Sequence, residues 1–485
     1  MRVKVLLTVL LAAAILAGAT GCGGTGTSAG RLSWHGCDGH FDCATLLVPV
    51  SYSDPRGAQI PISVVELPAS RPHPIGDLVL NPGGPGASGV QFLEQAGSSF
   101  PATLRARFNL VSFDPRGAGS SEPLQCLTRA GILGVIGANP APKTSRQIDA
   151  VVRTTKAFVR GCERNASRAF ISSMSTANTA RDMNRLRVAL GQTRLTYFGF
   201  SYGTYLGTVY AEMFPKHVRA LVLDGAVDPA LDTGTLDADQ AAGFETELHA
   251  FFTWSPEYAS AYRALTAGYR TSFRFLAAYR PELGNGQERV DYGAFLLATL
   301  AGLYSKASWP ELGRALWGAQ ANDASDLAGF AYSYAGENAD GSFSNILSAG
   351  TATSCLDRRW PSTIGAYKAL ASRLGKSAPH FGAAEAWSTL ACAYWPTRTT
   401  ARPAAAHAPG APPSLVIGST GDPATPYMWA EALARQLPRA TLLTRDGVGH
   451  TAYWFSSCIR EWTDRYLETL RLPPPGTVCA SDPLP

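Results

Sequence analysis

Residues 196–207 read TYFGFSYGTYLG and place Ser201 between Gly199 and Gly203. The apolar residues before the serine are typical of a buried strand, and those after it are compatible with a helix. Two glycines at this spacing have no role in a regular strand or helix, but they are needed where the backbone turns so sharply that side chains would collide. The pattern G-x-S-x-G between a strand and a helix therefore predicts a turn that exposes a nucleophilic serine. Because serine is also a good helix N-cap, the partners of Ser201 must decide between the two roles.

A hydroxyl nucleophile needs a base, and the base needs an orienting carboxylate. On a turn of this kind the chain order is serine, then acid, then histidine. After Ser201, His450 lies in the glycine loop DGVGH that follows a late strand-like run, whereas four other histidines lack this setting: His217, His249, His380 and His407. The strand-like run at 414–418 leads into STGDPATP, which supplies Asp422. We predict Ser201 as nucleophile, Asp422 as orienting carboxylate and His450 as general base and then acid, with Thr425 either hydrogen-bonding near Asp422 or shaping a turn. Activity should then rise through a pKa near the ordinary histidine value of about 6.5.

A glycine-rich loop, NPGGPGASG at residues 81–89, follows the strand-like run DLVL and contains the spacing G-x-G-x-x-G. Read alone, this spacing is a fingerprint of dinucleotide binding. Pro85 argues against that interpretation because it removes a backbone donor, and no acidic residue ends a second strand about 20 residues later. In serine hydrolases with alternating strands and helices, the loop after an early strand donates a backbone N–H to the oxyanion. We therefore predict an oxyanion hole formed by the backbone N–H groups of Gly84 and Tyr202.

Short apolar runs alternate with helical patterns from residue 76 onward, which favours a mostly parallel sheet with helices on both faces. Aromatic-rich helical segments then replace the strands, a Pro/Ala-rich linker follows, and strand-like runs resume near the C-terminus. This order predicts one catalytic core interrupted by a helical cap. The expected boundaries are 31–228 for the N-terminal half of the core, 229–395 for the cap, 396–413 for the linker and 414–485 for the C-terminal half.

The N-terminus reads MRVKVLLTVLLAAAILAGATGC, a basic start followed by an apolar stretch shorter than the roughly 20 residues that span a bilayer. It predicts a signal peptide over residues 1–21. The ending Ala-Thr-Gly-Cys resembles a bacterial lipobox, although Ala19 replaces the usual leucine. Cys22 is therefore expected to be lipidated and followed by a flexible tether over 22–30, with plain secretion as the alternative. Either way we expect an extracytoplasmic protein whose membrane contact is limited to a lipid anchor.

Eight cysteines remain after Cys22, and an even number in an exported chain indicates four disulfides. Sequential clustering favours pairing between neighbours, although eight cysteines allow 105 connectivities. The stretch HGCDGHFDC also permits a zinc site built from His35, Cys37, His40 and Cys43, but a small disulfide loop fits an oxidising compartment better. No metal or organic cofactor is implied. The eight are Cys37, Cys43, Cys126, Cys162, Cys355, Cys392, Cys458 and Cys479.

Composition sets further limits. Hydrophobic residues make up 46% of the 485 residues and charged residues 16%, as in a globular protein with a large core. A net charge of +5 is small for this length, so nucleic-acid binding has no electrostatic support. We expect a monomer.

Six motifs occur in the order found in the α/β-hydrolase family of proline iminopeptidases: NPGGPGASG, FDPRGAGSSEP, GFSYG, LVLDG, GDPATP and GVGH. The chain most resembles the exported tripeptidyl aminopeptidases of actinobacteria, from about residue 34 to the C-terminus and least across the cap. The resemblance implies an α/β-hydrolase fold with a TAP-like C-terminal region, a Ser201–Asp422–His450 triad, and a disulfide between Cys458 and Cys479. Pro82 stands where proline iminopeptidases carry histidine, which favours the tripeptidyl branch.

The resemblance also implies a serine exopeptidase that releases short peptides, with tripeptides expected, from free N-termini through an acyl-enzyme. Such an enzyme needs carboxylates that hold the substrate ammonium group. Near the start of the cap the candidates are Asp228, Glu245 and Glu247, and the alternative for each is an ordinary solvated acid. One alternative is a carboxylesterase or lipase, because the same triad serves both reactions. Another is a lipid-anchored binding protein that has lost activity.

Overall fold

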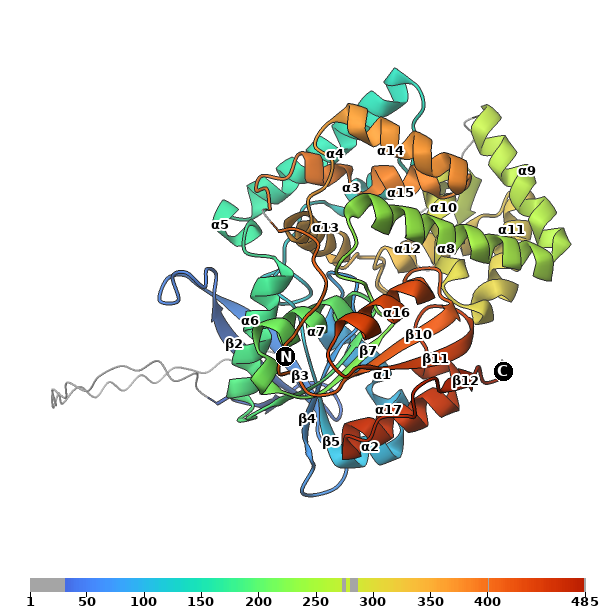
Figure 1. The fold of residues 1–485 in the computed structure, drawn as a ribbon. Coiled ribbons are helices and arrows are strands. Elements are labelled where there is room, and N and C mark those ends of the chain that lie inside the picture. Colours follow the sequence, from blue (N-terminus) through green and yellow to red (C-terminus); the bar gives the residue numbers. More distant parts are fainter. Residues whose placement is uncertain (1–30, 273–275, 280–286, 400, 484–485) are drawn as a thin grey trace, which may run out of the picture.

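The computed structural model describes residues 31–272, 276–279, 287–399 and 401–483. A large sheet with its flanking helices forms the lower part of the molecule, and a layer of helices covers it from above (Figure 1). The predicted signal peptide, the tether and the lipidation site at Cys22 lie outside the described residues.

The core is a ten-stranded sheet in the order β1-β2-β3-β5-β4-β6-β7-β10-β11-β12. The first three strands pair antiparallel, and β3 also pairs antiparallel with β5, whereas every pair from β5 to β12 is parallel. The mostly parallel sheet predicted from the strand–helix alternation is confirmed, as is the α/β-hydrolase fold that the family resemblance implies. The strands are β1 (His35–Gly36), β2 (Asp42–Pro49), β3 (Gln59–Leu67), β4 (Gly76–Asn81), β5 (Phe108–Phe113), β6 (Leu195–Phe200), β7 (Val218–Asp224), β10 (Leu415–Gly421), β11 (Thr441–Val448) and β12 (Val478–Ala480).

Alternate side chains of the central strands enter two separate hydrophobic cores, one on each face of the sheet. Leu78 and Phe198 pack with helix residues on one face, and Val79 and Tyr197 pack with helix residues on the other. Every residue of β6 is buried, as expected for a parallel strand covered on both sides. The covering helices are α1 (Gly89–Ala96), α2 (Ala102–Arg107) and α17 (Ser457–Thr469) on the first face, and α6 (Thr176–Ala189), α7 (Tyr202–Met213) and α16 (Tyr427–Gln436) on the second.

The main part of the cap is inserted between β7 and β10, so the chain leaves the sheet after one parallel strand and returns to its neighbour. It contains a two-stranded antiparallel sheet, formed by β8 (Leu276–Tyr279) and β9 (Gln287–Val290), that the sequence analysis did not predict. Its helices are α8 (Thr233–Trp254), α9 (Pro256–Ser272), α10 (Tyr292–Leu303), α11 (Trp309–Gln320), α12 (Ser325–Tyr334), α13 (Ile346–Asp357), α14 (Ile364–Ser377) and α15 (Gly382–Ser388).

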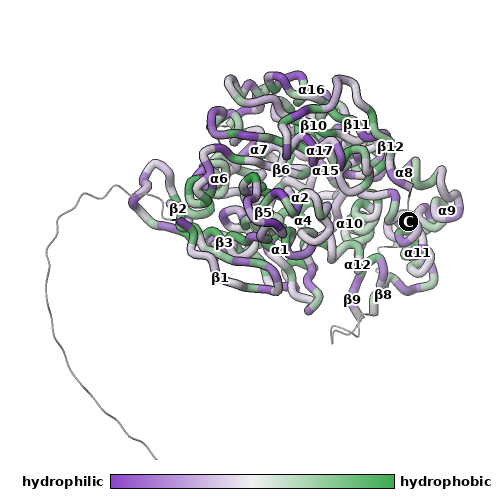
Figure 2. Tube along the Cα trace, turned by 90° about the horizontal axis from the view of Figure 1, so that it is seen from below, coloured by the Kyte–Doolittle hydropathy of each residue, from purple (hydrophilic) through white to green (hydrophobic). Residues whose placement is uncertain are grey.

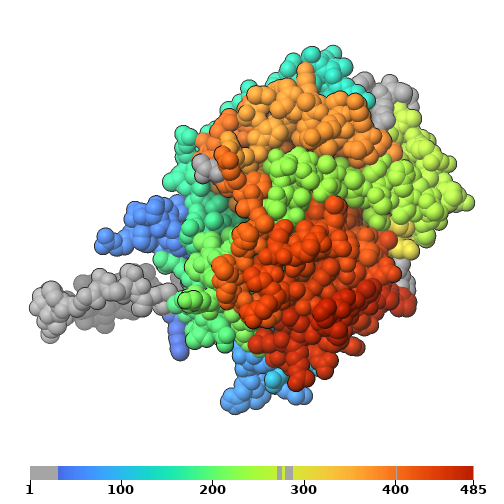
Figure 3. All heavy atoms as spheres, viewed as in Figure 1, coloured from blue at the N-terminus to red at the C-terminus, as the bar shows by residue number. Residues whose placement is uncertain are grey.

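A second, earlier insertion also contributes to the cap. Between β5 and α6 the chain forms α3 (Arg129–Ile136), α4 (Ser145–Asn165) and α5 (Arg168–Ile171), and α3 and α4 lie in the upper layer beside α14 (Figure 1). Ile132 and Ile136 share one hydrophobic core with residues of α10, and Ile148 shares another with Tyr367 of α14. The cap is therefore assembled from two segments, the first of which the sequence analysis had included in the N-terminal half of the core. The space-filling view shows the orange α14 region above the green α8 region, and the red C-terminal half of the core below both (Figure 3).

All eight described cysteines are paired with their neighbours in sequence, as predicted: Cys37–Cys43, Cys126–Cys162, Cys355–Cys392 and Cys458–Cys479. The first pair occupies the thiols of the alternative zinc site, and the last is the pair that the family resemblance implies. In the described ranges no helix is long and apolar enough to cross a membrane. Figure 2 shows hydrophilic and hydrophobic segments alternating along the described chain.

Candidate active site

Ser201 occupies a strained turn between β6 and α7. Its φ of 55° and ψ of −127° lie outside the regions that L-residues normally adopt. A Cβ on Gly199 would stand 2.4 Å from the carbonyl oxygen of Gly203, and one on Gly203 would stand 2.7 Å from that of Asn81. The two flanking glycines are therefore required by the turn, as predicted. The side chain of Ser201 makes no capping hydrogen bond to α7, so the simple N-cap role does not apply.

The glycine-rich loop after β4 lies directly against this turn. Gly83 and Gly84 both have positive φ, and a Cβ on Gly83 would stand 3.0 Å from the Cβ of Ser201. The N–H of Gly83 donates to Oδ1 of Asn81, which fixes the start of the loop. Tyr202 is the first residue of α7, so its N–H has no acceptor within the helix. The loop is thus packed on the serine turn, where it suits an oxyanion site better than a dinucleotide cradle.

His450 and Asp422 are in direct contact. The imidazole Nδ1 lies 2.9 and 3.0 Å from the two carboxylate oxygens. Asp422 is buried and accepts backbone N–H groups from Ala424, Thr425 and Thr451, which orient the carboxylate. The hydroxyl of Thr425 donates to Asp422 and lies 3.3 Å from Nδ1 of His450, so it joins the same network.

The environment of His450 changes its proton affinity. Burial opposes protonation, but the charge of Asp422 and its hydrogen bond outweigh burial and raise the pKa of His450 above its ordinary value. This corrects the expectation of a pKa near the ordinary value. The backbone carbonyl of Tyr304, at the end of α10 in the cap, accepts the backbone N–H of His450 at 2.8 Å. The phenol ring of Tyr304 packs edge-to-face with the imidazole, with 5.3 Å between the ring centres. The cap therefore contacts the histidine directly.

Asp224, at the end of β7, connects the serine turn to the histidine loop, a role that sequence reasoning missed. Its carbonyl accepts the N–H of Ser201 at 2.8 Å, and its carboxylate accepts the N–H groups of Ala452 and Tyr453. Burial raises the pKa of Asp224 to about 6 despite these hydrogen bonds. The motif LVLDG contained the signal, since an acid at the carboxyl end of a strand beside β6 must lie close to Ser201.

The predicted residues gather at one edge of the sheet because β6, β7 and β10 are parallel neighbours whose carboxyl ends meet there. A Cβ on Gly225 would stand 3.2 Å from the Cε1 atom of His450. Gly225 directly follows Asp224, whose carbonyl accepts the N–H of Ser201, so the imidazole lies next to the serine turn. All these residues are described, and no hydrogen bond joins the Ser201 hydroxyl to the imidazole. In free enzymes such contacts are often long and tighten when substrate binds.

Three acids near the start of the main cap insertion were candidates for binding a substrate ammonium group, and each faces other parts of the protein. Asp228 accepts from Gln436 at 2.8 Å, and Glu245 binds the ring and backbone of His380. Glu247 is buried against Gly421 beside Asp422, and burial together with that neighbouring charge raises the pKa of Glu247 to about 7.

Glu247 also has an oxygen, Oε2, without a hydrogen-bond partner among the described residues, and a second such acid lies elsewhere on α8. Asp237 of α8 is fully buried, and neither of its carboxylate oxygens has a hydrogen-bond partner among the described residues. Burial and the charge of nearby Glu385, on α15, raise the pKa of Asp237 although the charges of Arg358 and Arg373 lower it, and burial raises the pKa of Glu385. Glu385 also lines a mostly apolar cavity of about 340 Å³ between the two cap insertions. No sequence pattern pointed to this pair, because the two acids are far apart in the chain.

Glu385 is linked to the catalytic edge through two tyrosines. The ring of Tyr304 contacts His450, and its hydroxyl lies 3.0 Å from the hydroxyl of Tyr334. After burial, the charge of Glu385 is among the causes that raise the pKa of both tyrosines. Ring-centre spacings of 5.3 and 5.5 Å lead from His450 through Tyr304 to Tyr334.

Comparison with known proteins identifies close relatives. Residues 78–259 match the family described as alpha/beta hydrolase fold, and residues 378–479 match the family described as TAP-like protein. Serine protease Hip1 of Mycobacterium tuberculosis (strain ATCC 25618 / H37Rv) is 34% identical over 455 residues, covering 90% of this chain and 87% of that protein. Tripeptidyl aminopeptidase of Streptomyces lividans is 32% identical over 482 residues, covering 94% and 87%. Carboxylesterase B of the same Mycobacterium tuberculosis strain is 34% identical over 504 residues, covering 97% and 95%.

Proposed function

Since the chain belongs to the α/β-hydrolase family and is a serine hydrolase, we propose that it is an exopeptidase that releases tripeptides from the free N-termini of peptides. The observation that carries this proposal is the contact between His450 and Asp422 at the sheet edge that also bears the strained Ser201 turn. The identities to a serine protease and to a tripeptidyl aminopeptidase support the peptide substrate.

In the proposed reaction, His450 accepts the proton of the Ser201 hydroxyl as the oxygen attacks the scissile carbonyl. Asp422 keeps Nδ1 of the imidazole protonated, so that Nε2 is the base. The N–H groups of Gly84 and Tyr202 donate to the oxyanion, and each such donor is worth about 10²–10³ in rate. The imidazolium then protonates the leaving amine, which departs and leaves an acyl-enzyme. Water, activated by the same imidazole, releases the tripeptide and restores Ser201.

We assign the substrate ammonium group to Glu385, which lines the cavity between the two cap insertions, with the buried acid Asp237 nearby. The two carboxylates repel each other, the charges of Arg358 and Arg373 offset part of that repulsion at Asp237, and a cation bound at Glu385 offsets more of it. Three extended residues span about 10 Å. The rings of Tyr304 and Tyr334, at successive spacings of 5.3 and 5.5 Å from His450, would lie along such a segment. A free amine bound at this distance would position the third peptide bond at Ser201.

A carboxylesterase is the second candidate, because one relative of 34% identity carries that name and the cavity beside Glu385 is mostly apolar. A substrate panel separates the two: free and N-acetylated tripeptidyl p-nitroanilides beside short p-nitrophenyl esters. We expect turnover of the free tripeptide to exceed that of the acetylated one at least tenfold. Equal rates on both peptides, or turnover of the esters alone, would contradict the exopeptidase proposal.

We also propose that the protein is exported and anchored through a lipid on Cys22. The four disulfides support an oxidising compartment. Labelling of growing cells with an alkyne fatty acid tests the anchor, with Cys22→Ala as control. We expect label on the wild type and none on the variant, and an unlabelled wild type released into the medium would favour plain secretion.

A further inference from the structure

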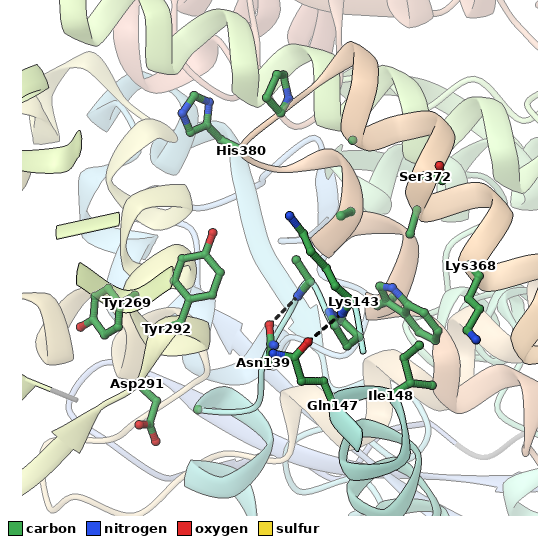
Figure 4. Close-up of a pocket in the computed structure, with 18 of the residues that line it drawn as sticks. Asn139, Lys143, Gln147, Ile148, Tyr269, Asp291, Tyr292, Lys368, Ser372 and His380 are labelled. Carbon is green, nitrogen blue, oxygen red and sulfur yellow. Dashed lines mark hydrogen bonds between the residues drawn. The ribbon is translucent and has the colours of Figure 1, made fainter. Parts of the chain in front are cut away.

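A cleft of about 950 Å³ lies in the cap where its two insertions meet (Figure 4). One wall is formed by residues 137–148, which comprise the loop after α3 and the first turn of α4. The opposite side is formed by α14 and by the junction of β9 with α10. Nothing in the proposed catalytic reaction uses this cleft.

The charges that line the cleft are mostly positive. Lys143, Lys368 and Lys376 all face it, and none has an ion-pair partner anywhere in the described ranges. Asp291 also lines the cleft, but it pairs with Arg289 at 3.1 Å, so this acid and this base offset each other. Three uncompensated ammonium groups therefore surround one cavity.

Helix α14 presents two of these lysines at a fixed spacing. Lys368, Ser372 and Lys376 follow each other at intervals of four residues and line the cleft from one face of the helix. Its other face buries Tyr367 and Leu374 in the cap. Eight residues of α-helix rise about 12 Å, which separates the backbones of the two lysines along the cleft.

Lys143 approaches from the opposite wall, and Figure 4 shows its side chain extending into the cavity. This wall is ordered by side chains that bond its backbone. Oδ1 of Asn139 accepts the N–H of Ala141, and Oε1 of Gln147 accepts the N–H groups of Lys143 and Thr144. The lysine thus has a defined place on the cleft wall.

The position of Lys143 at the start of a long helix favours an anionic ligand. Thr144 caps α4, a helix of 21 residues, so Lys143 stands directly before the positive end of the helix dipole. The dipole and the ammonium group attract an anion from the same side, and the two lysines of α14 line the other side of the cleft.

We propose that the cleft is a binding site for an acidic segment of a peptide substrate. We name a peptide as the ligand because this inference rests on the proposed peptidase function. Four extended residues span about 13 Å, so carboxylates at both ends of such a segment reach both lysines of α14. The rings of Tyr292 and Trp387 in the lining suit a peptide better than a bare phosphate chain.

Direct binding to the full mature chain tests the site. Ser201→Ala prevents turnover, and the probe is a fluorescein-labelled 12-residue peptide whose distal half is rich in glutamate, beside the same peptide with glutamines. The combined variant Lys143→Gln, Lys368→Gln, Lys376→Gln is compared with Lys216→Gln, an exposed lysine of the core. Three partly screened ion pairs correspond to about a tenfold change in Kd. We expect the acidic peptide to lose that much affinity in the combined variant alone, and to lose affinity with added salt.

Two further measurements distinguish a peptide ligand from other anions, and a failure of the cleft proposal from a failure of the proposed function. Inorganic polyphosphate and vesicles containing anionic phosphatidylglycerol are offered to the same proteins, and tighter lysine-dependent binding of either would overturn the peptide assignment. Hydrolysis of a short tripeptidyl p-nitroanilide, measured with Ser201 intact, should be equal in wild type and in the combined lysine variant. Failure of every protein to hydrolyse it contradicts the proposed function rather than the cleft. Equal affinity of the acidic and neutral peptides for the Ser201→Ala protein would overturn the cleft.

Discussion

The edge of the sheet and the interior of the cap treat buried charge in opposite ways. At the sheet edge, Asp422 and Asp224 are buried, yet their carboxylates accept backbone N–H groups, and His450 contacts Asp422 directly. In the cap, Asp237 is equally buried and has no hydrogen-bond partner among the described residues. The three cleft lysines are exposed, and they have no ion pair among the described residues.

The difference indicates which part of each site the protein supplies. Hydrogen bonds made before the reaction hold the sheet-edge groups in place, as electrostatic catalysis requires. A buried acid without a hydrogen-bond partner, such as Asp237, costs stability in the free protein, and a cationic ligand offsets that cost. The exposed lysines of the cleft are available to an anionic ligand. We therefore assign the chemistry to the sheet edge and substrate selection to the cap. Variants in the two regions should affect different kinetic constants.

The largest effect is expected from Ser201→Ala, which removes the nucleophile without touching the cap. Loss of one nucleophile in a serine triad lowers kcat about 10⁶-fold. The measurement is steady-state hydrolysis of a tripeptidyl p-nitroanilide. A control is the melting temperature, which should not fall, because the turn loses only a hydroxyl. Retention of more than a thousandth of the wild-type rate would contradict the assignment of the nucleophile.

Asp422→Asn should have the next largest effect, again on kcat. Asparagine keeps the shape but loses the charge that orients and stabilises the imidazole, and the comparable change in a serine protease lowers kcat about 10⁴-fold. Thr425→Val, which removes one hydrogen bond of the same network, should cost far less, about tenfold. The same small loss in both variants would show that Asp422 does not orient the base.

Glu385→Gln should alter substrate binding more than the chemical step. Removing one of two carboxylates from the ammonium site is expected to raise KM for free tripeptides about 10- to 100-fold, on the order of 1.4–2.7 kcal/mol, and to leave N-acetylated substrates unchanged. Glu257→Gln, an exposed acid of α9, is the matched control. An equal effect on free and acetylated substrates would mean that Glu385 has only a structural role.

The smallest effect concerns pH. The base must be neutral to accept a proton, and the charge of Asp422 raises the pKa of His450, so the rate should rise with pH through a value above about 6.5. A p-nitrophenyl ester is the suitable substrate, because it has no amine and does not report on Glu385. The measurement is kcat/KM between pH 5 and 9. An acid limb centred at or below about 6.5 would contradict the electrostatic account of the site.

Much of the sheet edge could be predicted from sequence, because its residues belong to local patterns. The glycines around Ser201 are needed because larger side chains would clash at the turn, so they reveal the turn in the sequence. Strand order then brings Asp422 and His450 to the same edge. Asp224 was within reach of the same reasoning but was not assigned a role. In contrast, Asp237 and Glu385 meet through the packing of α8 on α15, which no spacing in the chain reveals. The placement of α3 and α4 in the cap escaped prediction for the same reason.

The central claim is that the hydroxyl of Ser201 is the nucleophile, activated by His450 and Asp422. The most direct test is to label the full mature protein with a fluorophosphonate and to map the modified residue by mass spectrometry of its peptides. The account predicts a single adduct on Ser201, formed far more slowly in His450→Ala. An adduct on another residue, or labelling of Ser201 at the same rate without the histidine, would contradict it.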